Sequence, residues 1–193
     1  MATINPERLK ANINAIVKNV LEAQAKAVTT AMFDLQADMI KRVFDAGSDV
    51  DGAGIGKYST TPMYYSLSQK TSQVRSSSLR PRGKDSNSPE FANGKKRKSQ
   101  YFPGGYSEFR STVGRQNSKV DLRLTGSLLR SIQVGIGSNQ VSLGFNNDNE
   151  FEKAKGNEER FNKVIFAPSV TEIEAIEQKW SEQVEDAFFS SFE

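Results

Sequence analysis

The 193-residue chain contains no cysteine and no histidine. The absence of cysteine excludes disulfides, thiolate zinc sites, iron–sulfur clusters and thiol nucleophiles. The absence of histidine removes the commonest general base and the commonest transition-metal ligand. Ser-His-Asp and Cys-His catalysis are therefore excluded. An enzyme built from this chain would depend on carboxylate, lysine or tyrosine chemistry, or on a hard cation held by oxygen ligands.

Long apolar runs are also missing. No stretch approaches the ~18 consecutive apolar residues of a membrane-spanning helix, which excludes a transmembrane role. The first residues show no basic segment followed by an apolar one, so we expect no secretory signal. Hydrophobic residues make up 36% and charged residues 25% of the chain, as in ordinary soluble proteins. We expect one domain over residues 1–193, made and used in a cytoplasm.

The net charge of +3 hides a strong partition along the chain. Residues 57–130 carry fifteen basic and four acidic groups, whereas residues 145–193 carry five basic and twelve acidic groups. Residues 1–56 are nearly balanced, and residues 131–144 carry no charge. This asymmetry indicates charged partners or self-association.

A long N-terminal helix is the clearest local prediction. Asn5, Pro6 and Glu7 are typical of a helix start, and no glycine or proline follows until Gly47, which is expected to end the helix near Ala46. A helix of about 38 residues is long for a domain of this size, which predicts packing against another subunit as well as against its own fold. The alternative is two helices separated by a kink. Apolar residues recur at three- and four-residue spacing: Leu9, Ile13, Ile16, Val20, Ala27, Val28, Met32, Leu35, Met39 and Val43.

Residues 62–100 form a basic segment with few apolar side chains and many Ser, Asn, Gly and Pro residues, which predicts a flexible arm or insertion. It is either a solvated surface loop, an arm that becomes ordered against phosphates or an acidic neighbour, or a localisation signal. The candidate interaction residues for assembly or DNA are Arg75, Arg80, Arg82, Lys95, Lys96, Arg97 and Lys98.

Residues 101–168 are predicted to form a β-rich core. The four aromatics of residues 101–109 surround a Pro-Gly-Gly turn and are expected to pack as a loop, with stacking on nucleic-acid bases as the alternative. Alternating apolar residues at 120–124 lead into a turn and a short helical stretch over 124–132. The strongest signal follows, a hairpin with strands at 132–136 and 141–145. The run 163–167 is expected to supply a further strand.

A final helix is expected over residues 169–190. Ser169 and Glu172 form a capping-box pattern, with Thr171 and Glu174 as the competing register. Trp180 lies on its apolar face, as a core anchor or an interface residue, and Phe188 is a second candidate for a subunit interface. The predicted fold is α+β: a small antiparallel sheet flanked by two terminal helices, with a basic insertion.

Acidic residues offer little support for a metal site or an enzyme. Asp49 and Asp51 match the start of a calcium loop, but the bidentate glutamate that such a loop needs is missing. The polar stretch after the hairpin has carboxylates that could act in acid–base work or hold magnesium, but without an apolar pocket it predicts a solvated face. We expect no enzyme activity, no metal and no cofactor. The carboxylates of the polar stretch after the hairpin belong to Glu150, Glu152, Glu158 and Glu159.

The segment LRLTGSLLRSI, which starts at Leu122, fits the pattern Leu-x-x-Thr-Gly-x-Leu-x-x-Ser-Ile, and residues 166–176 follow as the start of a capped helix. With the long helix, the basic insertion, this motif, the hairpin and the capped helix in that order, the chain resembles the tailed-bacteriophage virion-morphogenesis or tail-completion family, which includes neck proteins. It departs from the family at residues 146–161 and in its longer basic insertion. The motif residues are Leu124, Thr125, Gly126, Leu128, Ser131 and Ile132.

The resemblance implies a structural virion component, assembled in the bacterial host cytoplasm, that forms a ring of six or twelve copies at the head–tail junction. Its expected partners are further copies of itself, portal or head-closure proteins, tail proteins and the DNA that passes through the lumen, with no membrane. The alternative, drawn from charge alone, is a sequence-independent nucleic-acid-binding protein that uses the basic arm.

Overall fold

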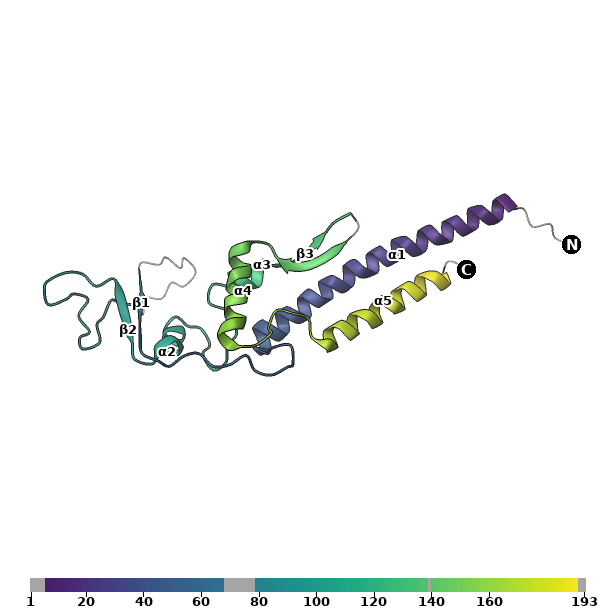
Figure 1. Cartoon of the computed structure of the whole chain (residues 1–193). Coiled ribbons are helices and arrows are strands. Elements are labelled where there is room, and N and C mark those ends of the chain that lie inside the picture. The colour runs from purple at the N-terminus through teal and green to yellow at the C-terminus, as the bar shows by residue number, and fades with distance from the viewer. Residues whose placement is uncertain (1–5, 68–78, 139, 191–193) are drawn as a thin grey trace.

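The N-terminal region forms one unbroken helix, as its apolar spacing predicts. The computed structural model describes residues 6–67, 79–138 and 140–190, so the expected cap at Asn5 lies outside it. Helix α1 (Pro6–Ile40) continues without a kink into a π-helical turn, η1 (Lys41–Ala46). Figure 1 shows α1 reaching far beyond the rest of the fold.

Gly47 ends this helix for two reasons. Its φ of 71° lies in the left-handed region that favours glycine, and its N–H donates to the carbonyl of Arg42. A Cβ at this position would also lie 2.6 Å from the carbonyl oxygen of Val120. The stop signal expected from the sequence is confirmed, and the contact with Val120 joins the helix end to the core.

Helix α5 (Val170–Ser190) lies beside α1 and runs back along it (Figure 1). The predicted capping box at its start is confirmed: the Glu172 N–H donates to Ser169 Oγ at 3.2 Å, and the Ser169 N–H donates to Glu172 Oε2 at 2.7 Å. The α1 side chains buried beneath it and the neighbouring hairpin are spaced four residues apart: Ala27, Ala31, Leu35 and Met39.

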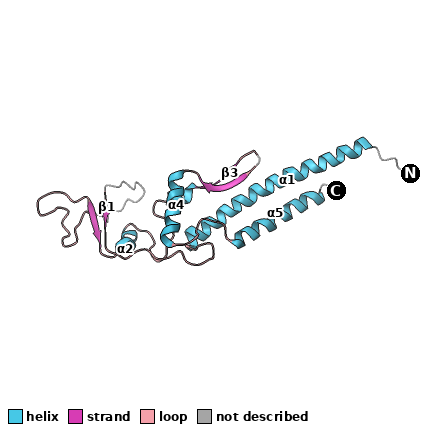
Figure 2. Cartoon of the chain, viewed as in Figure 1, coloured by secondary structure: helices cyan, strands magenta, loops and turns pink. Residues whose placement is uncertain are grey.

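Two small antiparallel sheets complete the α+β fold, which is confirmed, although its strands form two separate pairs (Figure 2). Strand β1 (Met63–Ser66) pairs with β2 (Ser99–Phe102) at the base of the arm. Strand β3 (Ile132–Ile136) pairs with β4 (Val141–Phe145) in the expected hairpin. This hairpin lies against α1, where Gln36 Nε2 donates to the carbonyl of Ile132 at 2.6 Å.

The region expected to be β-rich contains three helices: α2 (Gly105–Thr112), α3 (Ser127–Ser131) and α4 (Asp148–Phe161). Helix α3 confirms the short helical stretch predicted there, whereas α2 and α4 were not predicted. The interpretation of the polar stretch after the hairpin as a solvated, loop-like segment is wrong, because α4 begins where Asn147 Oδ1 accepts the N–H of Glu150. It ends at Asn162 in the left-handed conformation.

The strand expected at residues 163–167 is also absent from the described structure. The backbone N–H groups of Ile165 and Phe166 donate to the Glu158 carboxylate at 2.7 and 3.0 Å instead of to a neighbouring strand. The alternation at residues 120–124 likewise gives irregular chain, with Leu122 at a φ of 50° that a strand does not accommodate. Among the described helices, none combines the length and apolarity needed to cross a membrane.

Arg42 holds the start of α5 against the end of the long helix. Its Nε donates to Glu172 Oε1 at 2.8 Å, and its two Nη atoms donate to the carbonyls of Ile165 and Ala167 at 3.1 and 2.7 Å. Burial alone would raise the pKa of Glu172, but the hydrogen bonds and charge of Arg42 and the Ser169 N–H lower it below 4.5.

The substitution Glu172→Gln tests this contact. Removing the carboxylate leaves Arg42 half-buried without a counter-charge, so we expect a loss of about 3 kcal/mol of unfolding free energy at neutral pH. Because the folded pKa is lowered, the wild type should lose this contribution as the pH falls through that pKa, and the variant should not. Urea titrations at several pH values, followed by circular dichroism, measure both the loss of stability and its pH dependence. The exposed pair of Lys179 and Asp34 is the control, since Lys179→Met should leave the midpoint unchanged.

A second buried network joins the arm side of the molecule to the core. Arg110, on α2, is only 1% exposed, and its Nη2 donates to Asp121 Oδ1 at 2.8 Å. The Tyr58 hydroxyl donates to the same oxygen at 2.8 Å, and the Arg110 guanidinium lies 4.2 Å from the centre of the Tyr58 ring. A fully buried guanidinium needs such partners.

We expect Asp121→Asn to lower the free energy of unfolding by about 3–5 kcal/mol, because it leaves the buried Arg110 charge uncompensated. The partly exposed pair of Arg82 and Glu108 provides the comparison, and Glu108→Gln should cost about 1 kcal/mol or less. Equal losses from the two variants in urea unfolding would contradict this assignment.

Candidate functional site

The basic arm (described residues 79–98) extends from the base of the β1–β2 pair to the end of the molecule opposite the long helix (Figure 1). Its backbone is held by short turns, including bonds from the Phe91 N–H to the Lys95 carbonyl and from the Arg97 N–H to the Pro89 carbonyl, at 2.9 and 2.8 Å. The segment expected to be flexible therefore has a defined path in its described part. Arg75 lies outside the described residues.

Two of the predicted interaction residues are engaged within the fold. Arg82 donates to the Tyr101 carbonyl at 3.0 Å and pairs with Glu108 at 3.2 Å. The Arg97 guanidinium lies 4.2 Å from the centre of the Phe91 ring, and its Nε donates to the Glu90 carbonyl at 3.2 Å. These two arginines stabilise the arm itself.

The other predicted cations are exposed and available for a partner. Among the described residues, no ion pair or side-chain hydrogen bond engages the charged groups of these residues. The described arm, residues 79–98, contains seven basic and two acidic residues. The exposed predicted cations are Arg80, Lys95, Lys96 and Lys98.

The motif residues have structural positions. Gly126, with a φ of 77°, forms the turn before α3. Leu128 and Ile132 are buried in the core, and the Ser131 hydroxyl donates to the Leu128 carbonyl at 2.6 Å. Thr125 Oγ1 lies 3.0 Å from Ser127 Oγ, and Leu124 lines the adjoining hollow.

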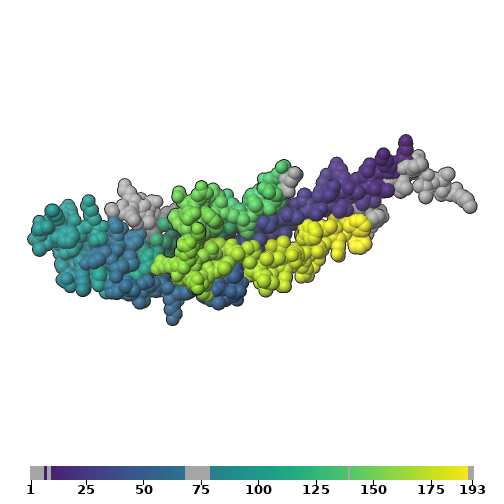
Figure 3. Space-filling view, viewed as in Figure 1, coloured from purple at the N-terminus to yellow at the C-terminus, as the bar shows by residue number. Residues whose placement is uncertain are grey.

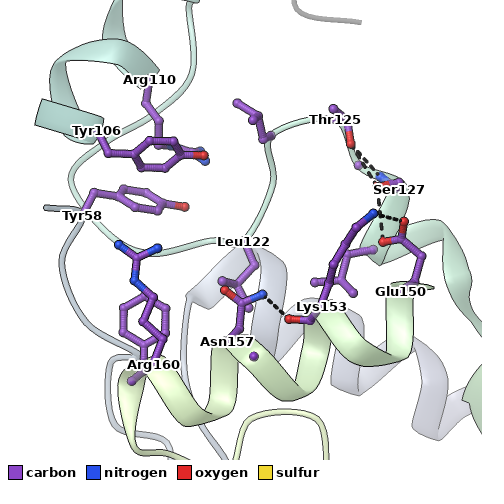
Figure 4. A pocket seen from close by; sticks show the side chains of 15 residues that line it. Tyr58, Tyr106, Arg110, Leu122, Thr125, Ser127, Glu150, Lys153, Asn157 and Arg160 are labelled. Atoms are coloured by element: carbon purple, nitrogen blue, oxygen red, sulfur yellow. Dashed lines mark hydrogen bonds and ion pairs between the residues drawn. The ribbon is translucent and has the colours of Figure 1, made fainter. Parts of the chain in front are cut away.

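A hollow of about 410 Å³ lies between this motif, α2 and α4. In Figure 4, the Tyr106 and Tyr58 rings and the Arg160 guanidinium lie one above another at one end, with Lys153 and Glu150 at the other end. Burial raises the pKa of both tyrosine hydroxyls above 10.0, so they stay protonated at neutral pH. The hollow therefore offers aromatic and cationic contacts but no tyrosinate base.

The acidic residues considered as an enzyme site have separate roles. Glu150 accepts hydrogen bonds from Ser127 and Lys153, whereas Glu158 accepts the two backbone N–H groups that follow α4. Glu152 and Glu159 are exposed. Within the described ranges, no group of three or more acidic residues could hold a metal ion.

The loop with the partial calcium pattern is held internally. Asp49 Oδ1 accepts the N–H groups of Asp51 and Ala53, and its Oδ2 pairs with Lys163. Burial alone would raise the pKa of Asp49, but Lys163 and these N–H groups lower it. The carboxylate thus serves as the centre of a turn, a role that the spacing of the acids alone did not predict.

The two interface candidates lie on α5. Trp180 is half-buried between α5 and α1, and its Nε1 is buried without a hydrogen-bond acceptor among the described residues. Phe188 is exposed. The length of α1 predicts packing against another subunit, but the sequence did not show which of its residues stay exposed: Ile13, Val17 and Leu21 are 50%, 51% and 59% exposed. Their four-residue spacing signals a single helical face, but only the structure shows that it is uncovered.

The structure thus has two surfaces suited to other macromolecules: the cationic arm and the uncovered face of α1. No family model, curated protein or solved structure matches the chain. The site residues are therefore assigned from their own contacts and charges.

Proposed function

We propose that the chain is a structural virion protein of a tailed bacteriophage that forms a ring at the head–tail junction. The ring would connect portal or head-closure proteins to the tail and let DNA pass through its lumen. The proposal combines the sequence resemblance with a carrying observation: the apolar face of α1 that the described chain leaves uncovered. Its role is assembly, without catalysis.

The uncovered face is a feature that a second subunit would bury. Ile13, Val17 and Leu21 follow one another at four-residue intervals on one side of a rigid helix. Contiguous exposed apolar patches are rare on monomeric proteins, and where they occur they often mark protein–protein contacts.

The distribution of charge favours a head-to-tail contact. The arm bears unpaired cations, whereas α5 carries six acidic residues and one lysine over 170–190. Opposite charges on different faces of one subunit complement each other in a heterologous interface, and such an interface closes into a ring when its rotation permits.

We expect the purified chain to form oligomers of six or twelve copies of its 21.4 kDa mass, visible as rings by negative-stain electron microscopy. Val17→Glu should shift the assembly toward monomer, with at least a tenfold higher dissociation constant, because it places a charge in the apolar contact. The helical circular dichroism signal should be unchanged, since Val17 is already half exposed.

Asn19→Glu is the matched control. Asn19 is exposed and lies on nearly the opposite side of α1, so this variant should assemble like the wild type. Light scattering that finds only monomer for the wild type, both alone and with portal or tail partners, would contradict the proposed function.

The unpaired arm cations favour a second candidate function, sequence-independent nucleic-acid binding. Lysines that neutralise phosphates release condensed counterions, so binding weakens steeply as salt increases. The same contacts would serve DNA inside a ring or DNA bound by a free subunit. The support for this alternative comes from the arm cations, which would contact phosphates and would not distinguish one base sequence from another.

We expect the triple variant Lys95→Gln, Lys96→Gln and Lys98→Gln to bind duplex DNA more weakly. The slope of log affinity against log salt should fall in magnitude by about 2–3, because up to three phosphate contacts are lost. The control removes the same charge elsewhere, at the exposed Lys41, Lys57 and Lys155. Fluorescence anisotropy over a salt series measures both, and equal slopes for the two triple variants would rule out the arm as the DNA site.

A further inference from the structure

A groove made of two hollows that share Val28 runs along α1, with an apolar part against α5 and a partly polar part against the β3–β4 hairpin. Its first part, about 150 Å³, is lined by Val28, Ala31, Met32, Ile176, Glu177 and Trp180. Its second part, about 330 Å³, lies between α1 and the hairpin tip, and Val28 lines both parts. In Figure 3 the surface of α1 is visible between the hairpin and α5. We call this feature the α1 groove.

The N-terminal segment of α1 (described residues 6–20) carries exposed apolar side chains that could lie along such a groove. It is a helix of fifteen residues, about 22 Å long, that carries Ile13 and Val17 on one exposed face. It cannot reach its own groove, because α1 continues without a break from this segment through Val28 to Ile40. The segment and the groove can meet only between two molecules.

We infer that the N-terminal segment of α1 from one copy packs into the α1 groove of a second copy of this chain. The inference rests on the proposed ring and specifies its subunit contact. Residues of one copy that protrude from the fold would be buried by a different surface of the next copy. The contact is heterologous, as a ring requires, when each copy inserts its segment into the next copy in one direction, whereas a reciprocal exchange between two copies would form an isologous dimer.

Charge complementarity supports a second copy as the occupant. Residues 6–20 contain Arg8, Lys10 and Lys18 against Glu7, a net charge of +2. The α5 wall of the groove is acidic, with a net charge of −5 over 170–190, and Glu177 lies at the groove itself. A basic helix beside an acidic wall gains favourable electrostatics in addition to apolar burial.

The same charges disfavour the direct pairing of two N-terminal segments. Two N-terminal segments packed against each other would bring together two helices of charge +2, and they would leave both grooves empty. Insertion into the groove covers the exposed apolar face and the groove in a single contact.

The absence of cysteine permits a direct test by engineered cross-linking. Val17→Cys and Met32→Cys are combined in one chain, where their positions on one straight helix are about 22 Å apart and cannot form a disulfide within a molecule. Under mild oxidation we expect a ladder of covalent multimers on a denaturing gel, with the 17–32 linkage identified by mass spectrometry. A product that stops at a doubly linked dimer would show reciprocal exchange between two copies and would overturn the head-to-tail contact. The control pair, Asn19→Cys with Met32→Cys, should give at least tenfold less cross-linked product.

The single variant Val17→Cys separates the two kinds of contact. If it alone forms disulfide dimers in high yield, the segments pair symmetrically and the inference is wrong. If the double variant fails to cross-link while the wild type is oligomeric by light scattering, the groove contact is wrong but the proposed ring stands. A wild type that stays monomeric at all concentrations overturns both.

Discussion

The structure depends on one cation at the end of a long helix. Arg42 binds the Glu172 carboxylate and the carbonyls of Ile165 and Ala167, so the chain that leads into α5 is held where α1 and η1 end. From this point α5 can only run back along α1. Its 21 residues then cover part of a helix whose α1 portion alone has 35 residues. The uncovered N-terminal segment is a direct consequence of this mismatch in length.

The arm is also held in place by cations, but through different contacts. Its sequence has few apolar side chains, and its described part is held by arginines that pack on aromatic rings and bind carbonyls. At its base, Arg110 is buried against Tyr58 and Asp121, which connects α2 to the core. Charge is thus used twice: buried cations position the arm, and exposed lysines remain for a partner. Engaged and exposed cations are neighbours in the sequence, as Arg97 and Lys96 show, and they differ in the side chains and carbonyls that surround them.

Local signals explain which parts of the fold could be predicted. The unbroken apolar spacing to Ala46, the left-handed Gly47, the capping box at Ser169 and the alternating hairpin all depend on residues close together in the chain. Helix α4 was missed because it is polar and its one core residue, Ala154, is a weak signal. The Asn147 cap was the available clue. The missing strand at 163–167 was unpredictable locally, because Glu158 takes the N–H groups that a strand would have used.

The candidate site also combines features that the sequence predicts with features that it does not. Sequence identified the basic arm, but it could not separate Arg82 and Arg97, which bind within the fold, from Lys95 and Lys96, which do not. That distinction depends on aromatic rings and carbonyls contributed by other segments. The length of α1 predicted packing against another subunit, but the sequence did not show which residues stay exposed, since their spacing resembles that of the buried face further along the same helix.

In the proposed ring, each contact of this exposed face contributes little energy by itself. Full burial of a valine or isoleucine side chain contributes about 1.5–3 kcal/mol, and Ile13 and Val17 are already half buried, so each adds about 1 kcal/mol. One such contact barely offsets the loss of translational and rotational freedom on association. In a closed ring, every subunit makes two contacts and the last subunit joins at both of its surfaces. Modest interfaces therefore become stable through closure, and dissociation of one subunit requires both of its contacts to break.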